Sequence, residues 1–419
     1  MAFSFQIGET AIPAAHTVQT ISVTGFTPKL VIIWGASGEN TDHMRVGWGM
    51  GTSSTNRVAR SVFSDHNVGT SDCRSYRSAS HIVYFDGPAA ADEAHADLDS
   101  LNDGNFKLDW STTGADVEGK FIQWLAIGGF DISDASVSSF TAPSSTGVSN
   151  HADSNFNVGA PDLAVYMTGN MIASDTFPKE RDHAVISIGV ATGTDEEWCV
   201  AIVAKDAVTT TVTYKGNRDD KCVGVIDDGS EAWEYLGEHS AFTFAGGNGG
   251  HDVNWTTATS SSKLIDVMFV RGGDYKAGLR AEKTTIGLDS VVGAGFQGSC
   301  VLGMGTEQNN NVLDGDLRLT ISAGSDTQNR FMWFGDEDNV GTTNCKSDKL
   351  DQMYRRFDMS MFLLCNFDLA TMDSDGFTTN WDIAGADPNE WCYLIMGGVE
   401  SMPSERGFSR GMSRPRGTF

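Results

Sequence analysis

Two stretches in distant parts of this chain are nearly the same peptide. Asn67–Ser75 has the sequence NVGTSDCRS, and Asn339–Ser347 has the sequence NVGTTNCKS. Repetition of this kind is typical of a chain that holds a tandem array of structural units. Further landmarks around these peptides recur in the same order three times, so we predict a repeating unit of about one third of the chain.

Four landmarks define the predicted unit. The first is an apolar run between glycines, seen at Gly25–Gly35, Gly159–Gly169 and Gly295–Gly305. The second is an apolar strand that runs into an aspartate, seen at Ile82–Asp86, Val223–Asp227 and Phe362–Asp368. The third is an aromatic residue followed by a tryptophan, with the tryptophan at Trp110, Trp255 and Trp381. The fourth is an apolar strand that ends in two glycines, seen at Phe121–Gly129, Leu264–Gly273 and Trp391–Gly398.

The length and spacing of these runs predict the fold class. Short apolar runs bounded by Gly and Pro favour strands over helices. Strands about ten residues apart, separated by Gly, Asn, Asp and Ser, are typical of a β-sandwich or jelly roll. We therefore predict an all-β protein of three tandem, jelly-roll-like β-sandwich domains. Their predicted bounds are 1–142, 143–285 and 286–419, and the last domain includes a basic C-terminal arm at about 400–419.

Charge and cysteine content limit the possible partners. The chain of 419 residues has a formal net charge of −26 at pH 7. Nucleic acids and anionic membranes are bound through clustered Lys and Arg, so this charge argues against both as partners. The sequence shows no secretion signal and no apolar run long enough to span a membrane. The seven cysteines are an odd number and fall mostly in apolar runs, so we expect buried free thiols, as in a protein assembled in a reducing cytoplasm.

Motifs for catalysis and metal binding are missing from the sequence. It holds no nucleophile elbow, no zinc-protease helix and no phosphate-binding loop, so we expect no enzymatic activity and no cofactor. The nine histidines are scattered singly. Acidic turns at 227–229, 336–338 and 373–376 offer the oxygen ligands that calcium prefers. The same residues are ordinary turn formers, so calcium binding and a solvated turn stay open as alternatives.

One loop suggests a contact surface. Gly229–His239 contains a tryptophan between acidic residues, and its counterparts in the other two units differ in length and composition. Variable loops on a fixed scaffold commonly carry binding function, and exposed aromatic rings can serve as platforms for ligands. The predicted contact residues are Glu231, Trp233, Glu234, Tyr235 and His239. The alternative is that Trp233 packs between two units. By contrast, the recurrence of Trp110, Trp255 and Trp381 at one place in the unit predicts that they are core residues.

The last twenty residues differ in charge from the rest of the chain. Residues 400–419 contain four arginines and two glutamates in an otherwise acidic protein. We predict an arm that docks onto a neighbouring copy through Arg406, Arg410, Arg414, Arg416 and Phe419. The alternative is a last strand followed by a short frayed end.

The order of the landmarks resembles a loosely characterised group of structural proteins of tailed bacteriophages and prophages. The resemblance rests on GFTPKLVIIW at Gly25–Trp34, on the strand Ile82–Asp86, on the Asp-Gly-Phe-x-x-x-Trp pattern of Asp375–Trp381, and on the strands that end in Gly-Gly. These are packing landmarks, so the resemblance carries no catalytic residue over. It implies a virion component that is assembled in the host cytoplasm.

We therefore expect a non-enzymatic virion protein on the particle surface, and a tail fibre or tail-tip adhesin is the first placement. A capsid decoration protein is an alternative, because three like domains in one chain could mimic a trimer. A lectin that binds sugar or calcium near Trp233 and Tyr235 is a second alternative. A capsule depolymerase is a third, and it would require two carboxylates about 5 to 9.5 Å apart. The expected partners are other virion proteins, further copies of this chain in a homo-oligomer, and a host surface glycan or receptor.

Overall fold

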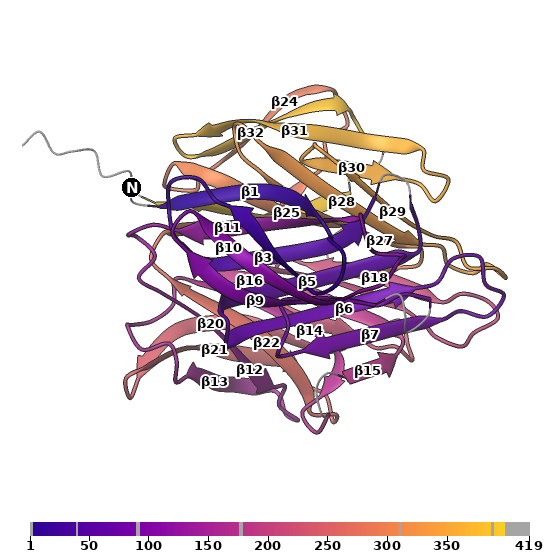
Figure 1. The fold of residues 1–419 in the computed structure, drawn as a ribbon, viewed down its shortest axis with the longest axis horizontal. Helices are drawn as coiled ribbons and strands as arrows, with labels where there is room; N and C mark the ends of the chain where they lie inside the picture. Colours follow the sequence, from indigo (N-terminus) through magenta and orange to yellow (C-terminus); the bar gives the residue numbers. More distant parts are fainter. Residues whose placement is uncertain are drawn as a thin grey trace, which may run out of the picture.

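The computed structural model describes residues 3–38, 41–88, 93–175, 179–309, 312–386 and 389–398. Throughout these ranges the regular structure is β-strand, and no helix occurs in them. The strands form six antiparallel sheets, three of seven strands and three of four strands (Figure 1). The predicted all-β sandwich fold is confirmed.

The N-terminal part of the chain supplies the first set of strands. They are β1 (Ser4–Ala11), β2 (Thr17–Ser22), β3 (Pro28–Ser37), β5 (Met44–Ser53), β6 (Asn56–Ser64), β7 (Cys73–Ser78), β8 (Val83–Phe85), β9 (Ala94–Asn102), β10 (Asn105–Thr113) and β11 (Phe121–Gly128). The large sheet of this set has the order β1-β11-β3-β5-β6-β7, and the small sheet has the order β2-β10-β9-β8.

The second and third sets repeat this order of strands. The second set consists of β12 (Asp134–Thr141), β13 (Gly147–Asp153), β14 (Leu163–Ile172), β16 (Ala184–Gly193), β17 (Glu196–Ala204), β18 (Thr213–Arg218), β19 (Val223–Ile226), β20 (Trp233–Ala245), β21 (Asn248–Thr257) and β22 (Lys263–Arg271). The third set consists of β23 (Asp274–Ala281), β24 (Gly287–Val292), β25 (Gly298–Gln308), β27 (Leu317–Gly324), β28 (Asn329–Asp336), β29 (Cys345–Leu350), β30 (Tyr354–Phe357), β31 (Leu363–Asp373), β32 (Gly376–Ile383) and β33 (Glu390–Gly397). Their large sheets run β12-β22-β14-β16-β17-β18 and β23-β33-β25-β27-β28-β29, and their small sheets run β13-β21-β20-β19 and β24-β32-β31-β30.

A short strand from another set completes each large sheet. β15 (Lys179–Asp182) of the second set pairs with β7 of the first, and β26 (Leu313–Asp314) of the third set pairs with β18 of the second. β4 (Thr41–Asp42) of the first set pairs with β29 of the third. Each set therefore gives one strand and receives one, so the three sets close into a ring.

The core has two levels. Side chains between the large and the small sheet of each set form separate sandwich cores, such as the one that contains Val31 and Ile33 of β3. The opposite face of the same strand carries Leu30, Ile32 and Trp34, which belong to one central core shared by the large sheets of all three sets. Because successive residues of a strand face opposite sides, a strand buried on both faces is apolar throughout. The continuous apolar runs of the first landmark have this cause.

The contacts between neighbouring sets are buried but chemically different. Between the first and second sets, Asp266 of β22 is held by Arg60 and Arg77, whose guanidinium groups lie 2.7 and 2.5 Å from it. Between the third and first sets, Gln123 donates from its amide to the carbonyl oxygen of Phe331 at 3.0 Å. Between the second and third sets, the Trp198 indole donates to the carbonyl oxygen of Tyr393 at 2.8 Å. The ring is thus closed by three unlike interfaces.

Two sequence expectations differ from the strand pairing. β12 and β23 pair with β22 and β33 respectively, so the pairing passes from one set to the next before Asp134 and before Asp274, upstream of the boundaries expected at 142 and 285. The second landmark was wrong in the third unit, because the strand equivalent to β8 is β30, with the sequence YRRF, and Phe362–Asp368 runs into β31 instead. β30 lacks the apolar pattern of a strand because it carries two arginines. One of them, Arg356, pairs with the buried Glu282 at 3.1 Å.

Candidate functional site

The predicted contact residues do not form one exposed surface. The segment that contains them is not a single loop, because β20 begins at Trp233 and its alternation turns Tyr235 into the sandwich core. Tyr235 and His239 are 0 and 4% exposed, and this burial corrects the predicted contact surface for both residues. Glu231 is exposed in the turn before β20. Glu234 lies 3.1 Å from the Lys263 ammonium and accepts hydrogen bonds from two hydroxyl groups.

Trp233 lies between two sets of strands. Its ring packs against the second sandwich core, as does Leu313 of the exchanged strand β26. Both side chains lie over Gly216 of β18, where an added Cβ would come within 3.1 Å of the Trp233 ring and 2.4 Å of Leu313. The glycine thus makes room for a contact between the second and third sets, which agrees with the packing alternative for Trp233.

The other predicted site residues fall into two groups. Trp110, Trp255 and Trp381 are 0, 1 and 1% exposed, and each lies in the core of its own sandwich. The register is the same at all three, since they pair with the first strands of the small sheets at Thr17, Gly147 and Gly287. The arm residues Arg406, Arg410, Arg414, Arg416 and Phe419 lie outside the described residues.

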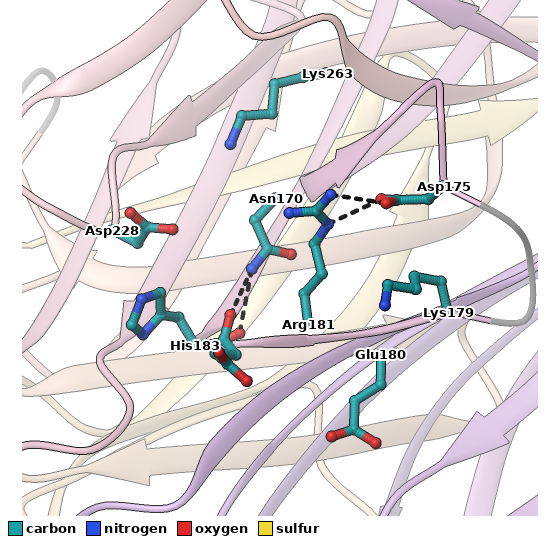
Figure 2. Close-up of a pocket in the computed structure, with 9 residues that line it drawn as sticks. Asn170, Asp175, Lys179, Glu180, Arg181, His183, Asp228 and Lys263 are labelled. Atoms are coloured by element: carbon teal, nitrogen blue, oxygen red, sulfur yellow. Dashed lines mark hydrogen bonds and ion pairs between the residues drawn. The ribbon is translucent and has the colours of Figure 1, made fainter.

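A polar pocket of about 460 Å³ lies beside the exchanged strand β15. Figure 2 shows its lining side chains, which come from β14, β15, β22 and three connecting segments. They are Asn170, Asp175, Lys179, Glu180, Arg181, Asp182, His183, Asp228 and Lys263. Asp228 directly precedes the segment predicted as a contact loop, and Lys263 pairs with Glu234 of that segment, so the pocket adjoins the predicted surface.

Several of the groups that line this pocket are already held by hydrogen bonds or ion pairs. Arg181 turns toward Asp175 and forms two hydrogen bonds of 2.8 and 2.7 Å (Figure 2). These bonds lower the pKa of the Asp175 carboxyl and raise the pKa of Arg181. Asn170 donates to the carbonyl oxygen of Asp182 at 2.8 Å, and His183 accepts from the backbone of Asp206 at 2.9 Å. These hydrogen bonds hold β15 in the position from which it pairs with the first set.

A second group of titratable side chains gathers in the first set. Asp86 is 3% exposed, and burial raises its pKa to about 6 although the guanidinium of Arg74 lies 3.3 Å away. Nearby, the rings of Tyr84 and His95 stack at 4.1 Å, and burial lowers the pKa of His95 to about 4. A carboxyl that titrates near neutrality suits proton transfer, but Asp86 is too deeply buried for a substrate to reach it.

Three equivalent loops meet where the exchanged strands cross between sets. We call their central residues the axial tips, at 67–71, 207–211 and 339–343. Each tip begins with a residue in the left-handed region, namely Asn67, Ala207 and Asn339, with φ of 61°, 57° and 56°. The repeated peptides that first indicated a tandem array contain two of these tips.

The axial tips are joined by hydrogen bonds that run around a ring. The backbone nitrogens of Asn67, Ala207 and Asn339 donate to the carbonyl oxygens of Thr343, Ser71 and Thr211, at 2.8, 2.9 and 2.9 Å. The backbone nitrogens of Thr343, Ser71 and Thr211 return bonds to the carbonyl oxygens of Val68, Val208 and Val340, at 3.0, 2.9 and 2.9 Å. The hydroxyl groups of Thr343, Ser71 and Thr211 also accept from the nitrogens of the same three valines. This ring defines a pseudo-threefold axis.

A small polar cluster lies just beneath the ring. The Ser64 hydroxyl donates to Asp336 at 2.7 Å, and it lies 3.2 Å from both Cys73 and Cys345. Burial raises the pKa of Asp336 to about 6 and raises the pKa of both thiols. All seven cysteines are free and buried, which confirms the expected state of the thiols.

The acidic turns use their oxygens within the fold. Asp227 accepts from the nitrogen of Gly229 at 2.7 Å, Asp375 from that of Gly295 at 2.6 Å, and Asp338 from that of Thr213 at 2.8 Å. Within the described ranges, no three His, Cys, Asp or Glu side chains are grouped to hold a metal ion. Whether these turns bind calcium stays a prediction.

Sequence reasoning missed the residues that close the ring. The exchanged strands are two to four residues long, too short to leave a pattern in the sequence. The pairing of Asp266 with Arg60 and Arg77 joins residues far apart in the chain, so spacing could not reveal it. Among these features, only the axial tips have a pattern in the sequence, namely the repeated peptide. That peptide predicts a repeating unit, but it does not predict that the tips contact one another.

In the part of the chain that the structure describes, no helix has the length and hydrophobicity to cross a membrane. Comparison of the chain with protein-family models and with curated proteins finds no match.

Proposed function

We propose that this protein is a non-enzymatic structural component of a virion and that it decorates the capsid at a threefold position. The observation that carries the proposal is the closed ring of three equivalent sets of strands around the axial tips. A homotrimer reaches threefold symmetry with three chains, whereas this chain offers a pseudo-threefold body by itself. The resemblance of its landmarks to structural proteins of tailed phages supports the virion setting.

Ring closure favours a capsid position over a tail fibre. A repeat array that joins head to tail extends into a filament unless its rotation closes. Here the third set gives β26 to the second and receives β4 from the first, so the exchange ends within one chain. This supports a compact cap or plug rather than a segment of a longer fibre.

The candidate pocket supports an assembly role over catalysis. Its two best-placed cations are already paired, Arg181 with Asp175 and Lys263 with Glu234. A substrate would have to displace these two ion pairs, one of which holds Arg181 of the exchanged strand β15. The lining also counts against a sugar site in this pocket, since it includes no tryptophan, tyrosine or phenylalanine ring on which a sugar could stack.

The test is to locate the protein on particles. Particles would be produced from the genes that flank this one, with and without this chain, and compared by cryo-electron microscopy. We expect additional density on threefold positions of the capsid in the complete particles only. Density on the tail would overturn the capsid placement in favour of an adhesin, and particles without any added density would overturn the virion role.

A further inference from the structure

We propose that the axial tips are the face by which this protein docks onto three copies of one partner polypeptide arranged around a threefold axis. The inference rests on the proposed function and names the surface that would carry it out.

The three tips are chemically alike as well as structurally equivalent. Their sequences are NVGTS, AVTTT and NVGTT, so each has valine second, threonine fourth and a hydroxyl-bearing residue fifth. The pattern of exposure is also the same, with the first, third and fourth positions exposed and the fifth buried in every tip. Among the exposed positions, the fourth carries threonine in all three tips, whereas the first and third differ only in the second set, where Ala207 and Thr209 replace an asparagine and a glycine.

The hydrogen-bonded ring accounts for only part of this likeness. A left-handed backbone favours asparagine at the first position, and the fifth position needs a hydroxyl to accept from the next valine. The fourth position makes no hydrogen bond in the ring. Thr70, Thr210 and Thr342 are exposed, and none of them has a hydrogen-bond partner among the described residues. Folding alone does not explain why all three are threonine.

The side chains that join neighbouring sets differ from one boundary to the next. The neighbouring sets contact one another through a carboxylate at Asp266, an amide at Gln123 and an indole at Trp198. Just beneath the ring, the equivalent ends of β6, β17 and β28 carry Ser64, Ala204 and Asp336. These buried positions thus differ between all three sets, whereas the exposed fourth tip position is threonine in every set. A partner that offers three identical surfaces accounts for this difference.

The charge of the tips also suits a docking surface. None of the fifteen tip residues is charged, although the chain has a formal net charge of −26. An interface core is depleted in charged residues because an unpaired charge is costly to bury. The tips therefore offer an uncharged contact area on a strongly acidic protein.

The test uses purified protein added to particles that were produced from the flanking genes without this chain. The test variant carries Thr70→Glu, Thr210→Glu and Thr342→Glu together, and a second variant carries Thr→Ser at the same three positions. The control variant carries Ser54→Glu, Thr194→Glu and Thr327→Glu, which place the same charge on the exposed turns between β5 and β6, β16 and β17, and β27 and β28. These turns lie at the opposite ends of the strands that lead into the tips. Melting temperature and mass in solution establish that each variant is folded.

We expect the wild type, the serine variant and the control to be retained on the particles, and the tip glutamate variant to be retained at least about tenfold less, because three unpaired carboxylates would face the partner. Retention of the tip variant at the wild-type level would overturn the docking face and leave the capsid role standing. Loss of a dimer in solution in the tip variant would assign the face to a second copy of this chain and overturn the threefold partner. Failure of the wild type itself to bind would overturn both proposals.

Discussion

Arg60 Nε donates a hydrogen bond of 2.7 Å to Asp266 Oδ2 across the boundary between the first and second sets of strands. Arg77 donates to the same carboxylate, and Asp266 itself is 0% exposed. The two guanidinium groups outweigh the effect of burial and hold the pKa of Asp266 at about 2. This contact joins residues of β6, β7 and β22, so its loss should act on the ring as a whole.

The first prediction concerns this buried contact. Asp266→Ala should lower the free energy of unfolding by about 3–5 kcal/mol, because it leaves two buried guanidinium groups without their carboxylate. Urea unfolding at pH 7 measures the effect. The matched control is Asp42→Ala, which removes an exposed pair with Lys346 between the first and third sets and should cost no more than about 1 kcal/mol. Equal losses in the free energy of unfolding for the two variants would contradict the conclusion that burial makes the Asp266 contact the more important one.

The second prediction concerns a fully buried histidine in the second sandwich. His251 is 0% exposed and shares a hydrogen bond of 2.6 Å with the Tyr166 hydroxyl. Burial, with smaller contributions from His151 and His239, lowers its pKa well below the ordinary value of 6.5. Below pH 6.5 the unfolded chain binds a proton here that the folded chain does not, so this group makes the protein less stable as pH falls.

His251→Asn should lower the free energy of unfolding at pH 7, because it removes the imidazole that shares a hydrogen bond with Tyr166. It should also reduce the dependence of that free energy on pH, because the variant has no imidazole to titrate. The difference in free energy of unfolding between wild type and variant should shrink by about 1.4 kcal/mol for each pH unit below 6.5. Denaturant unfolding at several pH values between 7 and 5 measures this change. The same substitution at the exposed His16 is the control. Parallel curves for wild type and His251→Asn would show that His251 takes up its proton in the folded state.

The third prediction has the opposite sign. Asp336 lies beneath the axial tips, and burial raises its pKa to about 6. A carboxyl that keeps its proton in the folded state stabilises the protein at low pH, and this contribution is lost as pH rises from about 4 through 6. Asp336→Asn should remove that loss, so the variant should gain stability relative to wild type as pH is raised from 4 to 7. Thermal unfolding across this range measures the gain. Asp351→Asn, at an exposed carboxylate, is the control.

The sequence predicted those features of the fold that leave a local pattern. The apolar runs at β3, β14 and β25 predicted strands because both faces of these strands are buried. The same rule failed at β30, since Arg355 and Arg356 interrupt its apolar pattern and the partner of Arg356, Glu282, lies far away in the chain. The candidate site was predicted less well, because no local pattern marks the start of β20 at Trp233, and the alternation of that strand buries Tyr235. Ring closure depends on strands as short as Thr41–Asp42, whose position only the folded chain determines.

The last prediction concerns the recurring tryptophans. The Trp255 indole is 1% exposed and donates to the Ser149 hydroxyl at 2.7 Å, which joins β21 to the edge strand β13. Trp255→Ala should cost about 3–5 kcal/mol, because the cavity cannot fully collapse between two packed sheets. Trp255→Phe should cost less, since it keeps most of the packing and loses the hydrogen bond.

Hydrogen exchange monitored by mass spectrometry should show faster exchange first in β13, β20 and β21, because these strands surround the cavity. Phe130→Ala, at a ring that is 88% exposed, is the control and should leave both stability and exchange unchanged. Uniform acceleration across all three sets after Trp255→Ala would mean that the ring unfolds as one cooperative unit, and the tryptophan would then stabilise the whole protein rather than its own sandwich.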